Sequence, residues 1–188
     1  MRVTSVNLAR VETRLFEGRH VRTAIAKRPV SGPVAVRRLG LEGDEQAETS
    51  LHGGLSKALY AYPALHYAFW QTVRAQARVS LWDDTLPPGA MGENLTIDGV
   101  DETMLWVGDR LVLPRCVLAV SEPRMPCFKF GAAMGFAQAV RLMAQSGFCG
   151  AYLAVIEEGE VGAGDLITLQ PGPREVNLRE LFRARMGR

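Results

Sequence analysis

Glycine and proline recur so often along this chain that most of it has no room for a long helix. Nineteen glycines and ten prolines are spread over 188 residues and divide the apolar stretches into short runs. Short apolar runs bounded by turn residues are typical of β-strands, so the sequence predicts a mainly β fold of many short strands, a barrel or a sandwich. The predicted strands are Val3–Leu8, Thr23–Lys27, Val34–Leu39, Ala58–Ala61, Asn94–Ile97, Leu111–Leu113, Val117–Ser121, Tyr152–Ile156 and Leu166–Leu169.

A few segments have the period of a helix instead. Pro63 suits a first helical position, and Leu65, Phe69 and Val73 follow on one face. The segment after it, Val79–Gly89, is predicted to be a surface loop because it is rich in proline and aspartate.

Two further helices are predicted closer to the C-terminus. The first would end at Gly147, a residue suited to the position just after a helix. Its apolar stripe, which is expected to be core, consists of Phe136, Ala139, Val140 and Met143. The second would begin after Asn177 as N-cap, with Glu180 completing a pair of capping residues. We therefore expect one β domain over residues 1–170, followed by a linker and a short amphipathic helix over 171–188.

Composition excludes several classes of protein. The 22 basic and 20 acidic residues give a net charge of +2, which is too weak to favour nucleic-acid binding. No apolar run approaches the length of a membrane span, and Met1–Leu8 alternates like a strand rather than a signal peptide. The three cysteines are widely spaced, which argues against a disulfide framework or a structural zinc site. A reducing cytoplasm is the expected location.

One cysteine lies in an unusual setting. Pro123 and Pro126 are expected to stiffen the loop that holds Cys127, and Arg124 and Lys129 place positive charge beside it. Positive potential favours the thiolate, the form that attacks electrophiles and binds metals. A lone cysteine is more often a small buried hydrophobe, and the local chemistry leaves both alternatives open.

Two glycine-rich segments also carry polar residues. After Gly40–Ala47 come His52, Gly53-Gly54 and Lys57, where backbone amides and cations suit an anion. Such a segment is also compatible with an ordinary turn and a surface histidine. In Gly89–Thr96, the Asn94 amide suits the edge of a heterocycle, although an Asx-turn at a strand entrance is an equal alternative.

Taken in order, these motifs resemble those of the MOSC family, named for the C-terminal domain of molybdenum-cofactor sulfurase. The similarity is greatest to its stand-alone bacterial branch, which includes a reductase that detoxifies N-hydroxylated purines. It extends from about Ile25 to about Asp165. The matching motifs are Gly43-Asp44, His52-Gly53-Gly54 with Lys57, Gly92–Leu95, Val107–Asp109 and Pro123–Lys129.

The resemblance implies a barrel-like MOSC fold that binds a molybdenum–pterin cofactor (molybdopterin), with the Cys127 thiolate as metal ligand. It places Cys127 and His52 in the catalytic centre and Asn94 against the pterin. Cys116 and Cys149 match no family motif and are expected to be packing residues. The residues expected to hold the cofactor, including its phosphate, are His52, Gly53, Gly54, Lys57, Asn94, Arg124 and Lys129.

The function implied by the resemblance is reduction of N-hydroxylated compounds, either purines or amidoxime-like molecules. The alternatives are a carrier that hands on the cofactor or a persulfide from Cys127, and a binding module without metal. No flavin, haem or iron–sulfur motif is present, so the expected partners are a small-molecule substrate and a separate electron-donor protein. A homodimer is left open. Relatives often continue into a helical C-terminal extension, so any function of that extension is left open as well.

Overall fold

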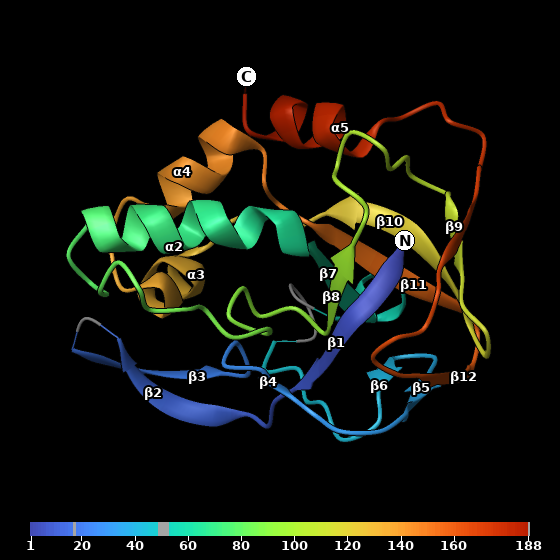
Figure 1. Cartoon of the computed structure of the whole chain (residues 1–188), viewed down its shortest axis with the longest axis horizontal. Helices are drawn as coiled ribbons and strands as arrows, with labels where there is room; N and C mark the ends of the chain where they lie inside the picture. Colours follow the sequence, from blue (N-terminus) through green and yellow to red (C-terminus); the bar gives the residue numbers. More distant parts are fainter. Residues whose placement is uncertain (17, 49–52, 188) are drawn as a thin grey trace.

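The computed structural model describes residues 1–16, 18–48 and 53–187, and its centre is one large curled sheet (Figure 1). Neighbouring strands of this sheet are antiparallel with one exception, β7 beside β8, where Ala61 lies opposite Leu95. A parallel pair needs a crossover, and α2 (Tyr67–Gln76) with the 3₁₀ turn η2 (Ala64–His66) provides it. In spatial order the strands are β13 (Thr168–Gln170), β9 (Arg110–Val112), β10 (Val117–Pro123), β11 (Ala151–Glu157), β7 (Leu59–Pro63), β8 (Leu95–Asp98), β1 (Arg2–Leu8) and β4 (Arg28–Pro29).

The two sides of the sheet approach each other without forming a closed barrel. An isolated bridge joins Arg2 of β1 to Leu166, just before β13. Val3 N donates to Asp165 O at 2.9 Å, and Ile167 N donates to Met1 O at 2.9 Å. The prediction of a mainly β, barrel-like fold is therefore confirmed. The barrel is not closed, because the edge strands β13 and β4 do not pair with each other.

Smaller elements surround the large sheet. They comprise a three-stranded sheet, a separate hairpin, a 3₁₀ turn and three more helices. Their bounds are β12 (Gly159–Val161), β5 (Val34–Arg37) and β6 (Gly40–Leu41); β2 (Glu12–Phe16) and β3 (Arg19–Thr23); η1 (Leu55–Lys57); α3 (Phe128–Met134), α4 (Ala139–Ser146) and α5 (Leu178–Arg185).

Two apolar clusters hold these layers together. The first lies within the curled sheet and consists mainly of valine, leucine and isoleucine. The second lies between the sheet and the helices and contains the fully buried Trp70, Phe130 and Met143. Helix α5 contributes Leu178 to the first cluster and Phe182 to the second. The C-terminal helix is therefore part of the packing of the domain.

Most predicted elements are present with shifted ends, but two predictions were wrong and one hairpin was missed. Thr23–Lys27 is not a strand, because β3 ends at Thr23 and residues 24–27 have no regular structure. The hairpin β2–β3 was missed because its strands are largely exposed and have no clear apolar alternation. Pro63 closes β7 and precedes a 3₁₀ turn instead of starting the helix itself.

The predicted helix ends near the C-terminus are confirmed. Gly147 follows α4 with a φ of 74°, the left-handed conformation that favours glycine. Asn177 caps α5, and its side-chain oxygen accepts from Arg179 N at 3.0 Å and Glu180 N at 3.3 Å. Among the described residues, no helix combines the length and apolar character needed to cross a bilayer.

Candidate functional site

An open pocket with about 630 Å³ of empty space lies where three loops meet beside β7 and β11. It brings together five of the residues predicted from the sequence, namely Lys57, Asn94, Arg124, Cys127 and Lys129. These residues come from distant parts of the chain. The pocket is also lined by Thr23, Ala24, Ile25, Lys27, Asp44, Glu45, Gln46, Ala47, Glu48, Tyr60, Gly92 and Tyr152.

Cys127 is half-buried at the pocket and directly precedes α3. Its backbone is extended, with φ −134° and ψ 170°, and its carbonyl accepts from Phe130 N at 3.0 Å. The predicted loop is therefore present but short, running from Arg124 to Cys127. Lys129, which was placed on the same loop, lies in α3 instead, because the apolar side of that helix packs Phe130 and Met134 into the core.

Arg124 is the most deeply buried cation of the pocket, with 5% of its surface exposed. Its guanidinium carbon lies 5.0 Å from the ring centres of both Tyr60 and Phe130. Burial alone would lower the pKa of Arg124, but Tyr60, Tyr152 and Cys127 outweigh it, so the pKa is raised. The group therefore stays charged.

One nitrogen of this guanidinium has an unmet hydrogen bond. Nη1 of Arg124 is buried and has no acceptor among the described residues. A buried donor without an acceptor costs about 1–3 kcal/mol, which is why such groups in folded proteins normally have a partner. Because Arg124 lines the pocket, this unsatisfied donor belongs to a side chain that borders the space for a ligand.

The two lysines of the prediction already have protein partners. Lys129 Nζ donates to Glu48 Oε2 at 2.9 Å and to Arg22 O at 3.1 Å. Lys57 Nζ lies 3.8 Å from Glu122 Oε1 and 5.6 Å from the ring centre of Tyr152. Both lysines add positive potential to the pocket. Unlike Arg124 Nη1, both already contact protein groups.

The glycine segment before η1 is only partly described. His52 lies outside the described residues. Gly54 has a φ of 86° and precedes η1, and neither Gly53 nor Gly54 is among the residues that line the pocket. The prediction that these amides and His52 hold a phosphate stays a prediction.

Asn94 borders the pocket, but its side chain forms hydrogen bonds with other residues of the protein. Its Nδ2 donates to Asp44 Oδ2 at 2.9 Å and to Asn7 O at 3.3 Å, while its Oδ1 accepts from Tyr60 N at 3.1 Å. Only 4% of the residue is exposed. Asn94 therefore links β1, β7 and the Asp44 loop through hydrogen bonds. Its predicted contact with a pterin stays a prediction.

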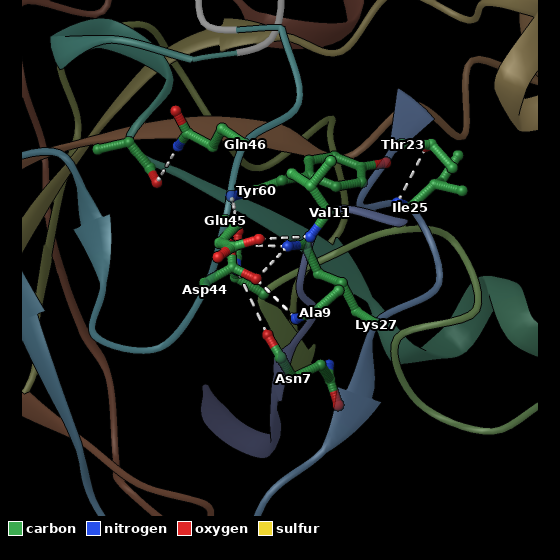
Figure 2. Close-up of polar contacts among 12 residues, drawn as sticks. Asn7, Ala9, Val11, Thr23, Ile25, Lys27, Asp44, Glu45, Gln46 and Tyr60 are labelled. Carbon is green, nitrogen blue, oxygen red and sulfur yellow. Dashed lines mark hydrogen bonds and ion pairs between the residues drawn. The ribbon is translucent and has the colours of Figure 1, made fainter. Parts of the chain in front are cut away.

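Lys27 and Asp44 form a buried ion pair that the sequence analysis did not identify (Figure 2). Lys27 Nζ donates to both carboxylate oxygens, at 2.6 Å for Oδ2, and Ala9 N donates to Oδ1 at 2.8 Å. Burial lowers the pKa of Lys27, and attraction to Asp44 and Glu93 offsets part of that shift. Asp44 belongs to a recognised motif, whereas no local pattern singles out Lys27.

A second polar network supports the pocket from behind. Glu93 is fully buried and accepts from Tyr67 Oη, from Gly89 N at 2.8 Å, from Met91 N at 3.1 Å and from Thr96 Oγ1 at 2.7 Å. Burial raises the pKa of Glu93, although these hydrogen bonds oppose the shift. The carboxylate holds the turn that places Gly92 at the pocket.

Cys127 is the one cysteine of the three that lines the pocket. Cys116 and Cys149 are 3% and 0% exposed and belong to the apolar clusters, as expected. Burial raises the pKa of both thiols, to about 11 for Cys116, where Asp165 adds to the shift. The described residues hold no group of three or more His, Cys, Asp or Glu side chains placed to bind a metal ion.

The sequence model of the MOSC domain matches residues 48–168, about two thirds of the chain. The chain belongs to the MOSC family. The matched range contains Lys57, Arg124, Cys127 and Lys129 of the pocket. The ion pair of Lys27 and Asp44 precedes it, so one wall of the pocket comes from outside the matched part of this MOSC protein.

Three comparisons place this MOSC protein among its relatives. It is 36% identical over 178 residues to the uncharacterized protein YflK of Bacillus subtilis, covering 94% of this chain and 77% of YflK. It is 32% identical over 173 residues to a Gibberella moniliformis protein named Reductase, covering 89% of this chain but only 30% of that protein. The crystal structure of YiiM from Geobacillus stearothermophilus is similar with a TM-score of 0.77 and 27% identity, covering 98% of this chain and 83% of YiiM.

Proposed function

We propose that this MOSC protein is an oxidoreductase that binds a molybdenum–pterin cofactor and reduces N-hydroxylated compounds. The observation that carries the proposal is the pairing, in one pocket, of the half-buried Cys127 thiol with the buried, unpartnered Nη1 of Arg124. Membership of the MOSC family and the fungal relative named Reductase support an oxidoreductase of this class.

The residues of the pocket fit such a cofactor. A thiolate is a soft ligand that suits molybdenum, and Cys127 is the thiol at the pocket. A single protein thiolate leaves the other ligands to the cofactor. The anionic phosphate of the pterin would be held by the Arg124 guanidinium, with Lys57 and Lys129 adding positive potential.

Reduction of an N-hydroxyl group consumes two electrons and two protons and releases water. When bound, the molybdenum centre would supply the two-electron chemistry. The chain itself has three tasks: holding the metal through Cys127, neutralising the phosphate through Arg124, and keeping the pocket walls in place. The last task belongs to Asp44, Asn94 and Glu93, whose hydrogen bonds join the loops around the pocket.

The test combines metal analysis with turnover. Protein purified from a host that makes the cofactor is analysed for molybdenum, and then supplied with a reduced viologen dye and an N-hydroxylated purine or an amidoxime. We expect molybdenum in the protein and formation of the amine or amidine, both absent in Cys127→Ser.

The other outcomes separate the alternatives. Bound molybdenum without turnover above the Cys127→Ser background would favour a carrier of the cofactor. Absence of molybdenum from protein made in a competent host would favour a binding module without metal. Either result contradicts the proposal.

A further inference from the structure

A second hollow lies on the other side of the pocket wall. It has about 1190 Å³ of empty space and is open to solvent. Ile25 and Lys27 line both hollows, so the segment from Ala24 to Lys27 separates them. We name this second hollow the basic groove. It is lined by Arg14, Ile25, Ala26, Lys27, Arg28, Pro29, Arg74, Leu86, Pro87, Gly89, Ala90, Ala133 and Met134.

The described charged side chains that line the basic groove are all basic. Arg14 comes from β2, Arg28 from β4 and Arg74 from α2, and none of the described residues that line the groove is acidic. The surrounding segment is also basic, because Arg10–Arg28 contains six Lys or Arg residues and two Glu. Lys27 is paired with Asp44 and Arg14 with Glu12, so the excess positive charge of the groove comes from Arg28 and Arg74.

The three arginines differ in how firmly they are held. Arg74 Nη1 donates to Met134 O at 2.5 Å and so links α2 to the end of α3. Arg14 pairs with Glu12, but 39% of its side chain is exposed. Arg28 is exposed on the two-residue strand β4. Arg28 is exposed, and the exposed Arg14–Glu12 pair contributes little to stability, so both arginines are placed to meet an incoming anionic surface.

Helix α3 connects the basic groove to the metal-binding cysteine of the proposed function. Cys127 directly precedes α3, and Ala133 and Met134 at the other end line the groove. Seven helical residues span only about 10 Å. Figure 1 shows the hairpin β2–β3 lying beneath α3 on this side of the molecule. A partner docked in the groove would thus lie about one short helix away from Cys127.

We propose that the basic groove is the docking site of an acidic electron-donor protein. This inference rests on the proposed function, since reduction of an N-hydroxyl group consumes two electrons and residues 1–188 hold no flavin, haem or iron–sulfur motif to carry them. Small carriers of the flavodoxin and ferredoxin type have negative surfaces around their redox group, which complement this groove. A macromolecule is favoured over a small ligand because the groove has about 1190 Å³ of empty space and its arginines come from three separate elements.

The experiment uses the molybdenum-loaded protein with reduced flavodoxin or reduced [2Fe–2S] ferredoxin as donor. The quantity measured is the KM for the carrier at about 50 mM and about 500 mM salt, with viologen-driven turnover of the same sample as the reference. The variants are Arg28→Glu and Arg14→Glu, with Arg28→Gln as the neutral version. The matched control is Arg183→Glu on the exposed side of α5, at the opposite end of the molecule in Figure 1.

We expect Arg28→Glu to raise the KM for at least one carrier about tenfold at low salt, Arg28→Gln to raise it less, and Arg183→Glu to leave it unchanged. The difference between variants should disappear at high salt. Equal KM values for Arg28→Glu and Arg183→Glu, or a KM that does not respond to salt, would overturn the proposal.

A binding measurement keeps this inference separate from the proposed function. Calorimetry with the oxidised carriers needs no turnover, so it reports on docking even if the viologen assay shows no reductase activity. Salt-sensitive binding that is lost in Arg28→Glu supports the groove. Absence of binding to both carriers, together with binding of a single-stranded oligonucleotide that Arg28→Glu abolishes, would assign the groove to nucleic acid instead.

Discussion

Lys27 donates to both carboxylate oxygens of Asp44 at the wall of the pocket, and the two side chains are only 8% and 5% exposed. Asp44 also accepts from Ala9 N and from Asn94 Nδ2, so this one carboxylate joins three segments of the chain. The pair therefore holds the pocket wall in place, and its loss would affect both the stability of the fold and the retention of a ligand.

Replacing Asp44 by Asn should lower the free energy of unfolding by about 3–5 kcal/mol, because it leaves the Lys27 ammonium buried without its counter-charge. Urea denaturation measures this loss. The double variant Lys27→Met with Asp44→Asn removes both charges, keeps an acceptor oxygen for Ala9 N or Asn94 Nδ2, and should recover most of the stability. If Asp44→Asn and the double variant were equally stable, the pair would not be the cause.

Replacing Cys127 by Ser should reduce bound molybdenum at least tenfold while leaving the fold intact, because Cys127 lies on a short loop at the pocket surface. Metal analysis and circular dichroism measure the two effects. Cys116→Ser and Cys149→Ser are the controls, since both residues lie in apolar clusters and should change stability alone. Full molybdenum occupancy in Cys127→Ser would exclude the residue as the ligand.

Replacing Arg124 by Lys should weaken retention of the cofactor, because an ammonium lacks the planar fork that binds two oxygens at once. Lys57→Ala should weaken it less, since Lys57 already lies near Glu122. The control is Arg183→Ala, an exposed residue of α5. Cofactor content after dialysis is the measurement. Equal retention in Arg124→Lys and Arg183→Ala would remove Arg124 from the phosphate site.

Replacing Gly92 by Ala should both strain the backbone and push against Ile25 in the pocket wall. Gly92 has a φ of 82°, and an added Cβ would lie 2.9 Å from Ile25 Cγ1 at the pocket wall. Gly164, with a φ of 95° and open space around it, is the matched control. Both variants should lose about 1–3 kcal/mol to backbone strain, and only Gly92→Ala should also lose molybdenum. Normal metal content in Gly92→Ala would contradict this expectation.

The buried carboxyl of Glu93 should make stability depend on pH in a recognisable way. Its pKa is raised by burial, so the folded protein binds a proton there more tightly than the unfolded chain does. The contribution of Glu93 is therefore fully present below the ordinary glutamate pKa of about 4.3 and is lost as pH rises through the raised value.

Glu93→Gln removes this titration. The difference in unfolding free energy between the natural protein and Glu93→Gln should thus grow as pH falls from 8 to about 5. Urea denaturation at several pH values measures it, and a difference that does not change with pH would show that Glu93 keeps one protonation state throughout.

The sequence predicted the parts of the pocket that follow from local chemistry. Cys127 between cations, and a mainly β fold from glycine and proline spacing, needed no knowledge of tertiary contacts. Lys27 was missed because its partner Asp44 is seventeen positions away and the segment around it resembled a strand. Helix α3 was missed because Pro123 and Pro126 predicted a stiff loop, whereas the burial of Phe130 and Met134 favours the helix.

The bridge between Arg2 and Leu166 has a consequence for how the chain acquires its structure. A contact across more than 160 residues raises the contact order, and proteins dominated by such contacts fold slowly. During synthesis at about 5–20 residues per second, β1 must wait several seconds before its last partner leaves the ribosome. The other half of this edge pairs early with β4, so only the Met1–Val3 end of β1 stays unpaired for most of translation, which leaves a short strand edge exposed to aggregation until the final strands arrive.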